Sequence, residues 1–308
     1  MNIRIGSLNI SERKGVVKNP IDRVEVDLSG IPADAHSGRW HRQISLLGRP
    51  SISRFEEQMK RRIGPGEFGE NITVEGIDLN EVGILDRFRI GEVEMEITQI
   101  GKTCHGDDCA IFREVGKCVM PQEGLFARVI RGGELQKGQE MEYIPYPFRI
   151  EIITASDRAA AGEYQDRSGP RAEELCRAHF GTKRWHMESE IQVVPDEAEA
   201  LRGALGKAQE RGADIIITTG GTGVGPRDIT VDVVRAMADK LIPGIMDHIR
   251  LKYGENKPNA LISRSICAMV GSTIVYTLPG SVKAVEEYLR EIFRSVDHLI
   301  TMVHGIGH

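Results

Sequence analysis

The chain has 308 residues, of which 40% are hydrophobic and 28% charged, and its formal net charge at pH 7 is −5. This length predicts roughly two domains with ordinary cores. Acids and bases are mixed along the chain, which argues against nucleic-acid binding, and no apolar run approaches the ~20 residues of a membrane-spanning helix. Because the N-terminus also lacks a signal-peptide pattern, we expect a cytoplasmic protein with neither nucleic acid nor membrane as partner.

The first half is predicted to be a small, mostly antiparallel β-barrel. Val24, Val26 and Leu28 alternate with charged residues, which is typical of half-buried strands, and similar runs follow. One amphipathic helix is expected over residues 51–62. We therefore predict a barrel-like, mostly-β fold for this half.

Two loops of this half contain candidate binding residues. Residues 31–43 concentrate basic and aromatic side chains, including His36 and Arg42, and such groups suit a phosphorylated heterocycle. A solvated loop with a hydrogen-bonded histidine explains the same composition. Residues 66–72 form a turn that can hold Asn71 inward, although an ordinary hairpin connection fits equally well.

A cysteine-containing stretch is the sharper signal. Cys104 follows Lys102 and precedes His105, and nearby cations favour the reactive thiolate. Cys109 and Cys118 add two sulfurs, so a zinc or iron–sulfur site is an alternative, but their spacing matches no regular zinc pattern. Buried thiols without a function are the other alternative. The five cysteines of the chain are an odd number, which does not fit a secreted disulfide framework.

Four segments of the first half occur together: Asp34-Ala35-His36…Trp40-His41-Arg42-Gln43, Gly69-Glu70-Asn71-Ile72, Lys102-Thr103-Cys104 and Glu123-Gly124-Leu125-Phe126-Ala127-Arg128-Val129. With them, about residues 5–145 resemble a MOSC domain, the β-rich module shared with molybdenum-cofactor sulfurases. One departure is Ala33, where the family has glycine. The resemblance implies that this half binds molybdenum cofactor or carries sulfur, with Cys104 at the family's characteristic cysteine. His36, Arg42 and Asn71 are its other predicted cofactor-binding residues.

The segment Tyr143-Ile144-Pro145-Tyr146-Pro147 is a short, stiff connector because its two prolines restrict the backbone. We place the domain boundary there, which divides the chain into residues 1–147 and 148–308. After it, apolar strands alternate with amphipathic helices. The expected strands are 148–155, 190–194, 214–217 and 274–278, and the expected helices are 170–180, 196–211, 230–238 and 281–300. This order predicts a doubly wound α/β domain.

A glycine-rich loop, Thr218-Thr219-Gly220-Gly221-Thr222-Gly223-Val224-Gly225-Pro226-Arg227-Asp228, follows one buried strand. Glycines allow close backbone approach to a ligand, and free N–H groups near a helix N-terminus favour phosphate. A tight strand-to-helix connection without function is the alternative. The loop is neither a Walker A motif nor a dinucleotide fingerprint.

In a doubly wound domain, ligands bind beyond the carboxyl ends of the strands. Besides the loop, the predicted strand ends carry Ser156-Asp157, Asp196 and Pro279-Gly280-Ser281. Asp196 and Asp228 supply oxygen ligands of the kind that hold Mg²⁺ beside nucleotide phosphates. Taken singly, Asp196 also fits a plain helix N-cap and Asp228 an ordinary turn acid.

The second half carries further motifs in a fixed order: Ser156-Asp157-Arg158-Ala159, Pro195-Asp196-Glu197, the glycine loop, Arg227-Asp228-Ile229-Thr230, Ile242-Pro243-Gly244, Leu261-Ile262-Ser263-Arg264 and Leu278-Pro279-Gly280-Ser281. With them it closely resembles the MogA/MoaB family of molybdopterin-handling enzymes. The resemblance implies AMP transfer from Mg-ATP to molybdopterin, with Asp196 and Asp228 as catalytic and Mg²⁺-binding residues. The expected ligand-binding residues are Ser156, Asp157, Thr219, Gly220, Gly221, Thr222, Gly223, Arg227, Ser263, Arg264, Pro279, Gly280 and Ser281.

Two other functions fit the same motifs. The chain is alternatively a non-catalytic carrier of finished molybdenum cofactor, or a sulfur transferase acting through Cys104. The expected partners are molybdopterin, ATP and a molybdenum insertion enzyme or a molybdoenzyme acceptor. A homo-oligomer is also expected, because relatives of the second half commonly form trimers.

Overall fold

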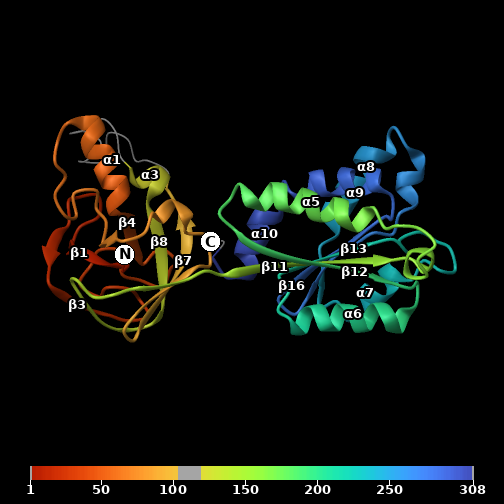
Figure 1. Cartoon of the computed structure of the whole chain (residues 1–308), viewed down its shortest axis with the longest axis horizontal. Helices are drawn as coiled ribbons and strands as arrows, with labels where there is room; N and C mark the ends of the chain where they lie inside the picture. The colour runs from red at the N-terminus through yellow and green to blue at the C-terminus, as the bar shows by residue number, and fades with distance from the viewer. Residues whose placement is uncertain (1, 103–118, 307–308) are drawn as a thin grey trace. The chain divides into compact units, whose positions relative to one another are not determined.

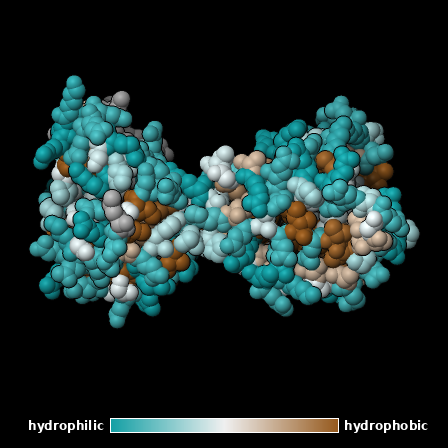
Figure 2. All heavy atoms as spheres, in the orientation of Figure 1, coloured by the Kyte–Doolittle hydropathy of each residue, from teal (hydrophilic) through white to brown (hydrophobic). Residues whose placement is uncertain are grey.

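The computed structural model describes residues 2–102 and 119–306, and the chain forms two compact units, Met1–Tyr146 and Pro147–His308 (Figure 1). No helix of the described ranges is long and apolar enough to cross a membrane. On the face drawn in Figure 2, hydrophilic residues cover most of the surface and hydrophobic ones form small separate groups. The apolar side chains are therefore mainly interior, where they form the cores of the two units.

The first unit is built around one eight-stranded sheet. Its strands are β1 (Arg4–Ile10), β2 (Asn19–Ile21), β4 (Ile44–Gly48), β5 (Ile72–Glu75), β6 (Arg87–Ile90), β7 (Val93–Ile100), β8 (Leu125–Arg131) and β10 (Glu142–Ile144), in the order β10-β6-β7-β8-β4-β5-β1-β2. β4 and β5 are parallel, and the other neighbours are antiparallel. A separate antiparallel ladder joins β3 (Arg23–Val26) to β9 (Gly133–Gln136).

This sheet curls back on itself. The Ile5 N–H donates to the Gln139 carbonyl over 3.0 Å, and the Met141 N–H donates to the Ile3 carbonyl over 2.9 Å. These bonds join β1 to the segment just before β10, although β10 lies at the far end of the strand order. The curl encloses one apolar core, to which nearly every strand contributes alternate side chains. The predicted mostly-β fold of the first half is thereby confirmed.

Short helices lie beside this sheet: α1 (Arg49–Met59), the 3₁₀ turn η1 (Leu79–Glu81) and α3 (Met120–Glu123). α1 corresponds to the helix predicted over residues 51–62. It starts earlier because Pro50 suits the first helical turn, and it ends earlier because Lys60 adopts a left-handed conformation with φ 51°.

The second unit is a doubly wound α/β domain, as predicted. Its six-stranded sheet has the order β12-β11-β13-β16-β15-β14. The first four are parallel, β15 is antiparallel to β16, and β14 is antiparallel to β15. The strands are β11 (Pro147–Ala155), β12 (His186–Val194), β13 (Ile215–Thr219), β14 (Lys240–Leu241), β15 (Cys267–Val270) and β16 (Thr273–Leu278). The two antiparallel strands were not predicted.

Helices cover both faces of this sheet. α5 (Ser168–Gly181) and α9 (Val282–Ile292) lie on one face, and α6 (Ala198–Glu210) and α7 (Thr230–Met237) lie on the other (Figure 1). The remaining helices are α4 (Asp157–Ala160), α8 (Pro243–Gly254), the 3₁₀ turn η3 (Pro258–Ile262) and α10 (Val296–Val303). The single helix predicted over residues 281–300 is wrong, because residues 293–295 interrupt it between α9 and α10. Phe293 ends α9 and stacks on His179 of α5, with ring centroids 4.2 Å apart.

Candidate functional site

The connections that follow β11, β13 and β16 pack closely against one another. Gly220 has φ +97°, and a Cβ there would lie 2.3 Å from the Ala155 carbonyl oxygen. A Cβ on Gly280 would lie 3.3 Å from the Gly220 Cα. Gly221 has φ +62° and would bring a Cβ within 2.3 Å of the Thr230 hydroxyl. Glycine is therefore required at 220 and 221 both for conformation and for space.

The glycine loop presents a row of unused backbone donors. The Gly220 N–H is bonded to the Leu278 carbonyl, so it is not free for a ligand. In the described chain, the N–H groups of Gly221, Thr222 and Gly223 have no hydrogen-bond acceptor. Consecutive free N–H groups of this kind form a binding cradle for an anion.

Asp157 and Asp196 form hydrogen bonds with each other between the segments that follow β11 and β12. The Asp157 N–H donates to the Asp196 carboxylate over 3.0 Å, and the Asp196 N–H donates to the Asp157 carboxylate over 2.9 Å. Asp157 also forms an ion pair with Arg227 of the glycine loop. The Asp196 N–H and Arg227 together lower the pKa of Asp157. The plain N-cap interpretation of Asp196 is wrong, because Glu197 is the residue that precedes α6.

The Asp228 carboxylate is bonded to the backbone of the glycine loop. Its Oδ2 accepts a hydrogen bond of 2.8 Å from the Gly225 N–H, so the residue does close a turn. A Cβ on Gly223 would lie 2.7 Å from the same oxygen. Within the described part of the chain, Oδ1 of Asp228 accepts no hydrogen bond. The carboxylate is thus held at one oxygen and available at the other.

A cavity of about 650 Å³ lies beside this loop, which is within the range of small-molecule sites. It contains several residues predicted from sequence: Thr222, Gly223, Asp228, Ser263, Pro279 and Ser281. Ser281 is also the N-cap of α9, where it accepts a hydrogen bond from the Ala284 N–H over 3.2 Å. The N-terminus of α9 therefore faces a site that already has free N–H donors, which favours a bound anion.

The sequence interpretation missed the side chains of the opposite wall: Tyr253, Lys257, Asn259, Lys283, Glu287 and Tyr288. They come from α8, α9 and the segment around η3. Lys257 pairs with Glu287, and the Tyr253 hydroxyl donates to the Glu287 carbonyl over 3.3 Å. No sequence motif marked these residues, and helical periodicity, where it is present, predicts packing without showing which helices enclose a cavity.

Other predicted residues lie outside the cavity. Asp196 does not line the cavity. Its carboxylate accepts from the Asp157 N–H, Asp157 is paired with Arg227, and Arg227 directly precedes the cavity residue Asp228. In the described ranges, no group of three or more His, Cys, Asp or Glu side chains is arranged to hold a metal ion. Ser156 caps α4 by accepting from the Ala159 N–H over 3.4 Å.

Thr219 lies fully buried beneath the loop. Its hydroxyl is 2.9 Å from the Ser168 hydroxyl and 3.1 Å from that of Thr154. Both partners bond to Asp166, which sequence analysis did not select as a site residue. Asp166 also accepts from the Ser168 N–H over 2.9 Å, which explains why α5 starts two residues before its predicted position. Thr219 therefore supports the loop from below.

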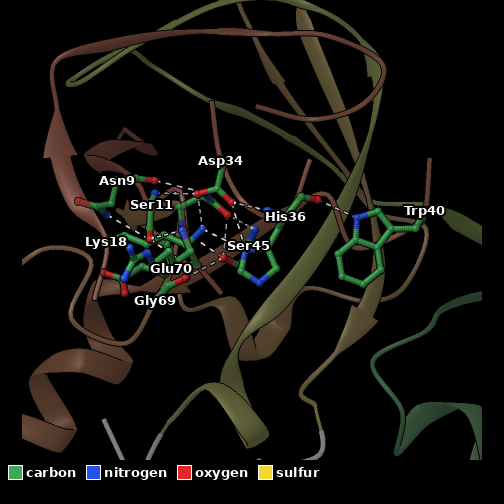
Figure 3. Close-up of polar contacts among 11 residues, drawn as sticks. Asn9, Ser11, Lys18, Asp34, His36, Trp40, Ser45, Gly69 and Glu70 are labelled. Carbon is green, nitrogen blue, oxygen red and sulfur yellow. Dashed lines mark hydrogen bonds and ion pairs between the residues drawn. The ribbon is translucent and has the colours of Figure 1, made fainter. Parts of the chain in front are cut away.

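In the first unit, Asp34 of the loop of residues 31–43 forms a buried ion pair with Lys18 (Figure 3). Lys18 and Asp34 are paired, with 1% and 0% of their side chains exposed. Asp34 also accepts from the Ser11 N–H over 3.0 Å and the His36 N–H over 2.9 Å. Burial would raise the pKa of Asp34, but the hydrogen bonds from His36 and Lys18 outweigh it and lower the pKa. His36 is thereby held by the network, while 27% of its side chain remains exposed.

Trp40 and Arg42 extend from the same loop. The Trp40 indole N–H donates to the His36 carbonyl over 2.7 Å (Figure 3). The Arg42 guanidinium lies 4.9 Å from the Trp40 ring centroid, and its Nε is buried without a hydrogen-bond partner in the described chain. Asn71, in contrast, is fully buried, and its Oδ1 accepts from the Ser45 N–H and hydroxyl. The predicted Cys104, like Cys109 and Cys118, lies outside the described residues.

These features define a class of protein: a doubly wound α/β domain with an anion cradle at its strand ends, joined to a curled, β-rich unit. Residues 151–298 match the model of a probable molybdopterin binding domain, and residues 33–142 match that of the MOSC domain. The chain is 32% identical over 159 residues to the molybdopterin adenylyltransferase of Escherichia coli (strain K12), covering 51% of this chain and 79% of that protein. The chain belongs to the molybdopterin adenylyltransferase family.

Other relatives match the same half. The molybdopterin adenylyltransferase of Helicobacter pylori (strain J99) is 29% identical over 157 residues, which cover 51% of this chain and 88% of that protein. A molybdenum cofactor biosynthesis bifunctional protein of Chlorobaculum tepidum is 31% identical over 173 residues, covering 56% of this chain and 53% of that protein. A solved structure titled "anomalous substructure of MogA" has a TM-score of 0.47 and 34% identity, and covers 50% of this chain and 99% of that one.

Proposed function

We propose that the second unit transfers AMP from Mg-ATP to the terminal phosphate of molybdopterin and releases pyrophosphate. The observation that carries the proposal is Asp228, which lines a cavity beside the free loop N–H groups and whose Oδ1 accepts no hydrogen bond within the described residues. A cavity of this size suits a pterin or a nucleotide, and the relatives named above carry the same activity in their names.

In the reaction, an oxygen of the molybdopterin phosphate forms a bond to the α-phosphorus of ATP. The bond from that phosphorus to the oxygen bridging to the β-phosphate breaks, and pyrophosphate leaves with the electron pair. The free N–H groups of Gly221, Thr222 and Gly223 would bind phosphate oxygens, and Ser281 with the α9 N-terminus would bind others. Catalysis of this kind depends mainly on positioning and charge stabilisation.

The protein residues fit a magnesium ion that arrives with ATP. Mg²⁺ in nucleotide sites is held by one or two carboxylates plus substrate phosphates, so it does not require three protein ligands. Within the described residues, Asp228 offers an Oδ1 that accepts no hydrogen bond. Asp196 follows β12, on the far side of β11, where Asp157 holds it. When bound, the ion neutralises charge on the phosphates.

The test is pyrophosphate release by the purified chain with molybdopterin and Mg-ATP. We expect Asp228→Asn to lower kcat at least about 100-fold, because it removes the charge that faces the phosphates while keeping the side-chain volume. Binding of molybdopterin should persist in this variant. If Asp228→Asn releases pyrophosphate at the parental rate, the role given to Asp228 is wrong. If the parent binds molybdopterin tightly without turnover, the chain is a cofactor carrier instead.

For the first unit, the proposal is binding of molybdenum cofactor or transport of sulfur. Arg42 supports the first alternative, since its buried Nε lacks a partner in the described chain and its guanidinium faces Trp40. Replacing Arg42 by methionine should weaken cofactor binding if this alternative holds. A persulfide on Cys104 after incubation with a cysteine desulfurase would favour the sulfur alternative.

We also propose a homo-oligomer, as well as a partner that inserts molybdenum or accepts the cofactor. Light scattering of the purified chain tests the first of these, and a mass equal to one copy would contradict it.

A further inference from the structure

Arg264 contacts the glycine loop at both ends of the segment that carries Asp228. Its Nε donates to the Gly223 carbonyl over 2.7 Å, and its Nη2 donates to the Asp228 carbonyl over 2.6 Å. Its backbone N–H donates to the Thr222 carbonyl over 2.9 Å. One residue from the segment after η3 therefore bonds to three carbonyl groups of the loop.

Asp232 of α7 holds the Arg264 guanidinium from the other side. Nη1 donates to Oδ1 over 2.9 Å, and Nη2 donates to Oδ2 over 3.0 Å, which is a bidentate pair. Four of the five guanidinium hydrogens, counting both bonds of Nη2, are thereby directed at protein oxygens. The guanidinium is therefore bonded to the protein itself, whereas the family resemblance had implied that Arg264 binds a ligand.

Contacts within the loop also hold the side chain of Asp228, separately from the bonds made by Arg264. Gly225 donates its N–H to the Asp228 carboxylate, and Gly223 leaves no room for a Cβ beside the same carboxylate. The side chain of Asp228 is thus set by the loop, while the main chain of Asp228 is set by Arg264. A shift of the main chain would carry the carboxylate with it.

We infer that Arg264 is a positioning residue that fixes the carboxylate of Asp228 at the cavity, with Asp232 orienting the guanidinium. This inference rests on the proposed AMP transfer. The planar fork of arginine bonds to two carbonyls and a carboxylate at once, whereas the single ammonium of lysine cannot reproduce that set of directions. A displacement of about 1 Å in a group that acts on the reaction can cost roughly 100-fold in rate.

The experiment is Arg264→Lys, which keeps the charge and removes the fork. We expect kcat for AMP transfer to fall at least about tenfold, while the Kd of molybdopterin changes less than about threefold. In an Asp228→Asn background, the same substitution should cause almost no further loss, because two residues that act through one group are not additive.

Arg211→Lys is the matched control. Arg211 also makes a bidentate pair, with Glu151, and its side chain is 38% exposed against 35% for Arg264. It follows α6, at the opposite end of the sheet from the cavity, so its substitution should leave kcat unchanged. Thermal unfolding of each variant shows whether the fold is kept.

Asp232→Asn is the second variant, needed if Arg264→Lys does not fold. It keeps all three bonds from Arg264 to the loop carbonyls and weakens only the orienting pair, so kcat should fall about two- to fivefold, again only when Asp228 is present. The inference is overturned if a folded Arg264→Lys, or Asp232→Asn in its place, has the parental kcat, or if its loss is the same in the Asp228→Asn background. A parent chain that transfers no AMP would instead refute the proposed function.

Discussion

Replacing Gly223 by alanine is expected to displace the Asp228 carboxylate. The added Cβ would lie 2.7 Å from Oδ2, 3.2 Å from Cγ and 3.4 Å from Oδ1 of Asp228. Non-bonded carbon atoms keep roughly 3.5 Å, so the carboxylate must move by about 0.5–1 Å. The move breaks the bond from the Gly225 N–H, a hydrogen bond to a charged group worth about 1.5–3 kcal/mol.

The expected loss of kcat for AMP transfer is roughly 10- to 100-fold, since a displacement of this size in a group that acts on the reaction has that effect. The free energy of unfolding should fall by about 1–3 kcal/mol, the usual cost of one extra methyl group in a packed site. Steady-state pyrophosphate release measures the first quantity and denaturant unfolding the second.

Gly203→Ala on α6 is the control. A Cβ at this position has no atom within 4 Å, so the substitution should leave kcat unchanged and stabilise the helix by about 0.5–1 kcal/mol. A folded Gly223→Ala variant with the parental kcat would refute the idea that the position of the Asp228 carboxylate limits the reaction.

Three further predictions follow from other contacts. Asp157→Ala removes the partner of both Asp196 and Arg227, so kcat should fall roughly tenfold at unchanged secondary structure by circular dichroism, and an unchanged kcat would contradict this. Burial would raise the pKa of Glu291, but hydrogen bonds from Lys252, His248 and Arg294 lower it to about 2. Because its folded pKa is below the unfolded value, the ionised Glu291 stabilises the fold above about pH 4.3, and this stabilisation is lost as the pH falls toward 2. The free energy of unfolding, measured with denaturant, should therefore differ less between pH 7 and pH 3 for Glu291→Gln than for the parent. Chelation of Mg²⁺ should stop AMP transfer while molybdopterin binding, measured by fluorescence, changes less than about threefold.

Much of the second unit could be predicted because its signals are local. Buried β-branched strands, amphipathic helices and glycines after a strand each follow from short-range patterning, and together they predicted which edge of the sheet carries the candidate site. The break after α9 could not be predicted from the local pattern. Phe293 at the break stacks on His179 of α5, a contact between helices that lie far apart in the sequence. The wall formed by Tyr253 and Tyr288 was missed for the same reason, since only the packing of α8 beside α9 brings them together.

The role of Arg264 shows a second limit of sequence reasoning. The family resemblance implied that Arg264 binds a ligand, but its guanidinium is paired with Asp232 of α7, which local sequence does not reveal. Likewise Asp196 resembles an N-cap in sequence, yet its carboxylate accepts from the Asp157 N–H of another strand end. Residue types were enough to predict a phosphate and magnesium site at this edge. Which of their atoms are used by protein contacts depends on tertiary structure, which the sequence pattern does not show.

The most direct test of the proposed activity is mass spectrometry of the product formed from molybdopterin, Mg-ATP and the purified chain. We expect adenylylated molybdopterin in a one-to-one ratio with released pyrophosphate, formed at least about 100-fold more slowly by Asp228→Asn. Molybdopterin recovered unchanged, with no pyrophosphate formed by the folded parent chain, would contradict it.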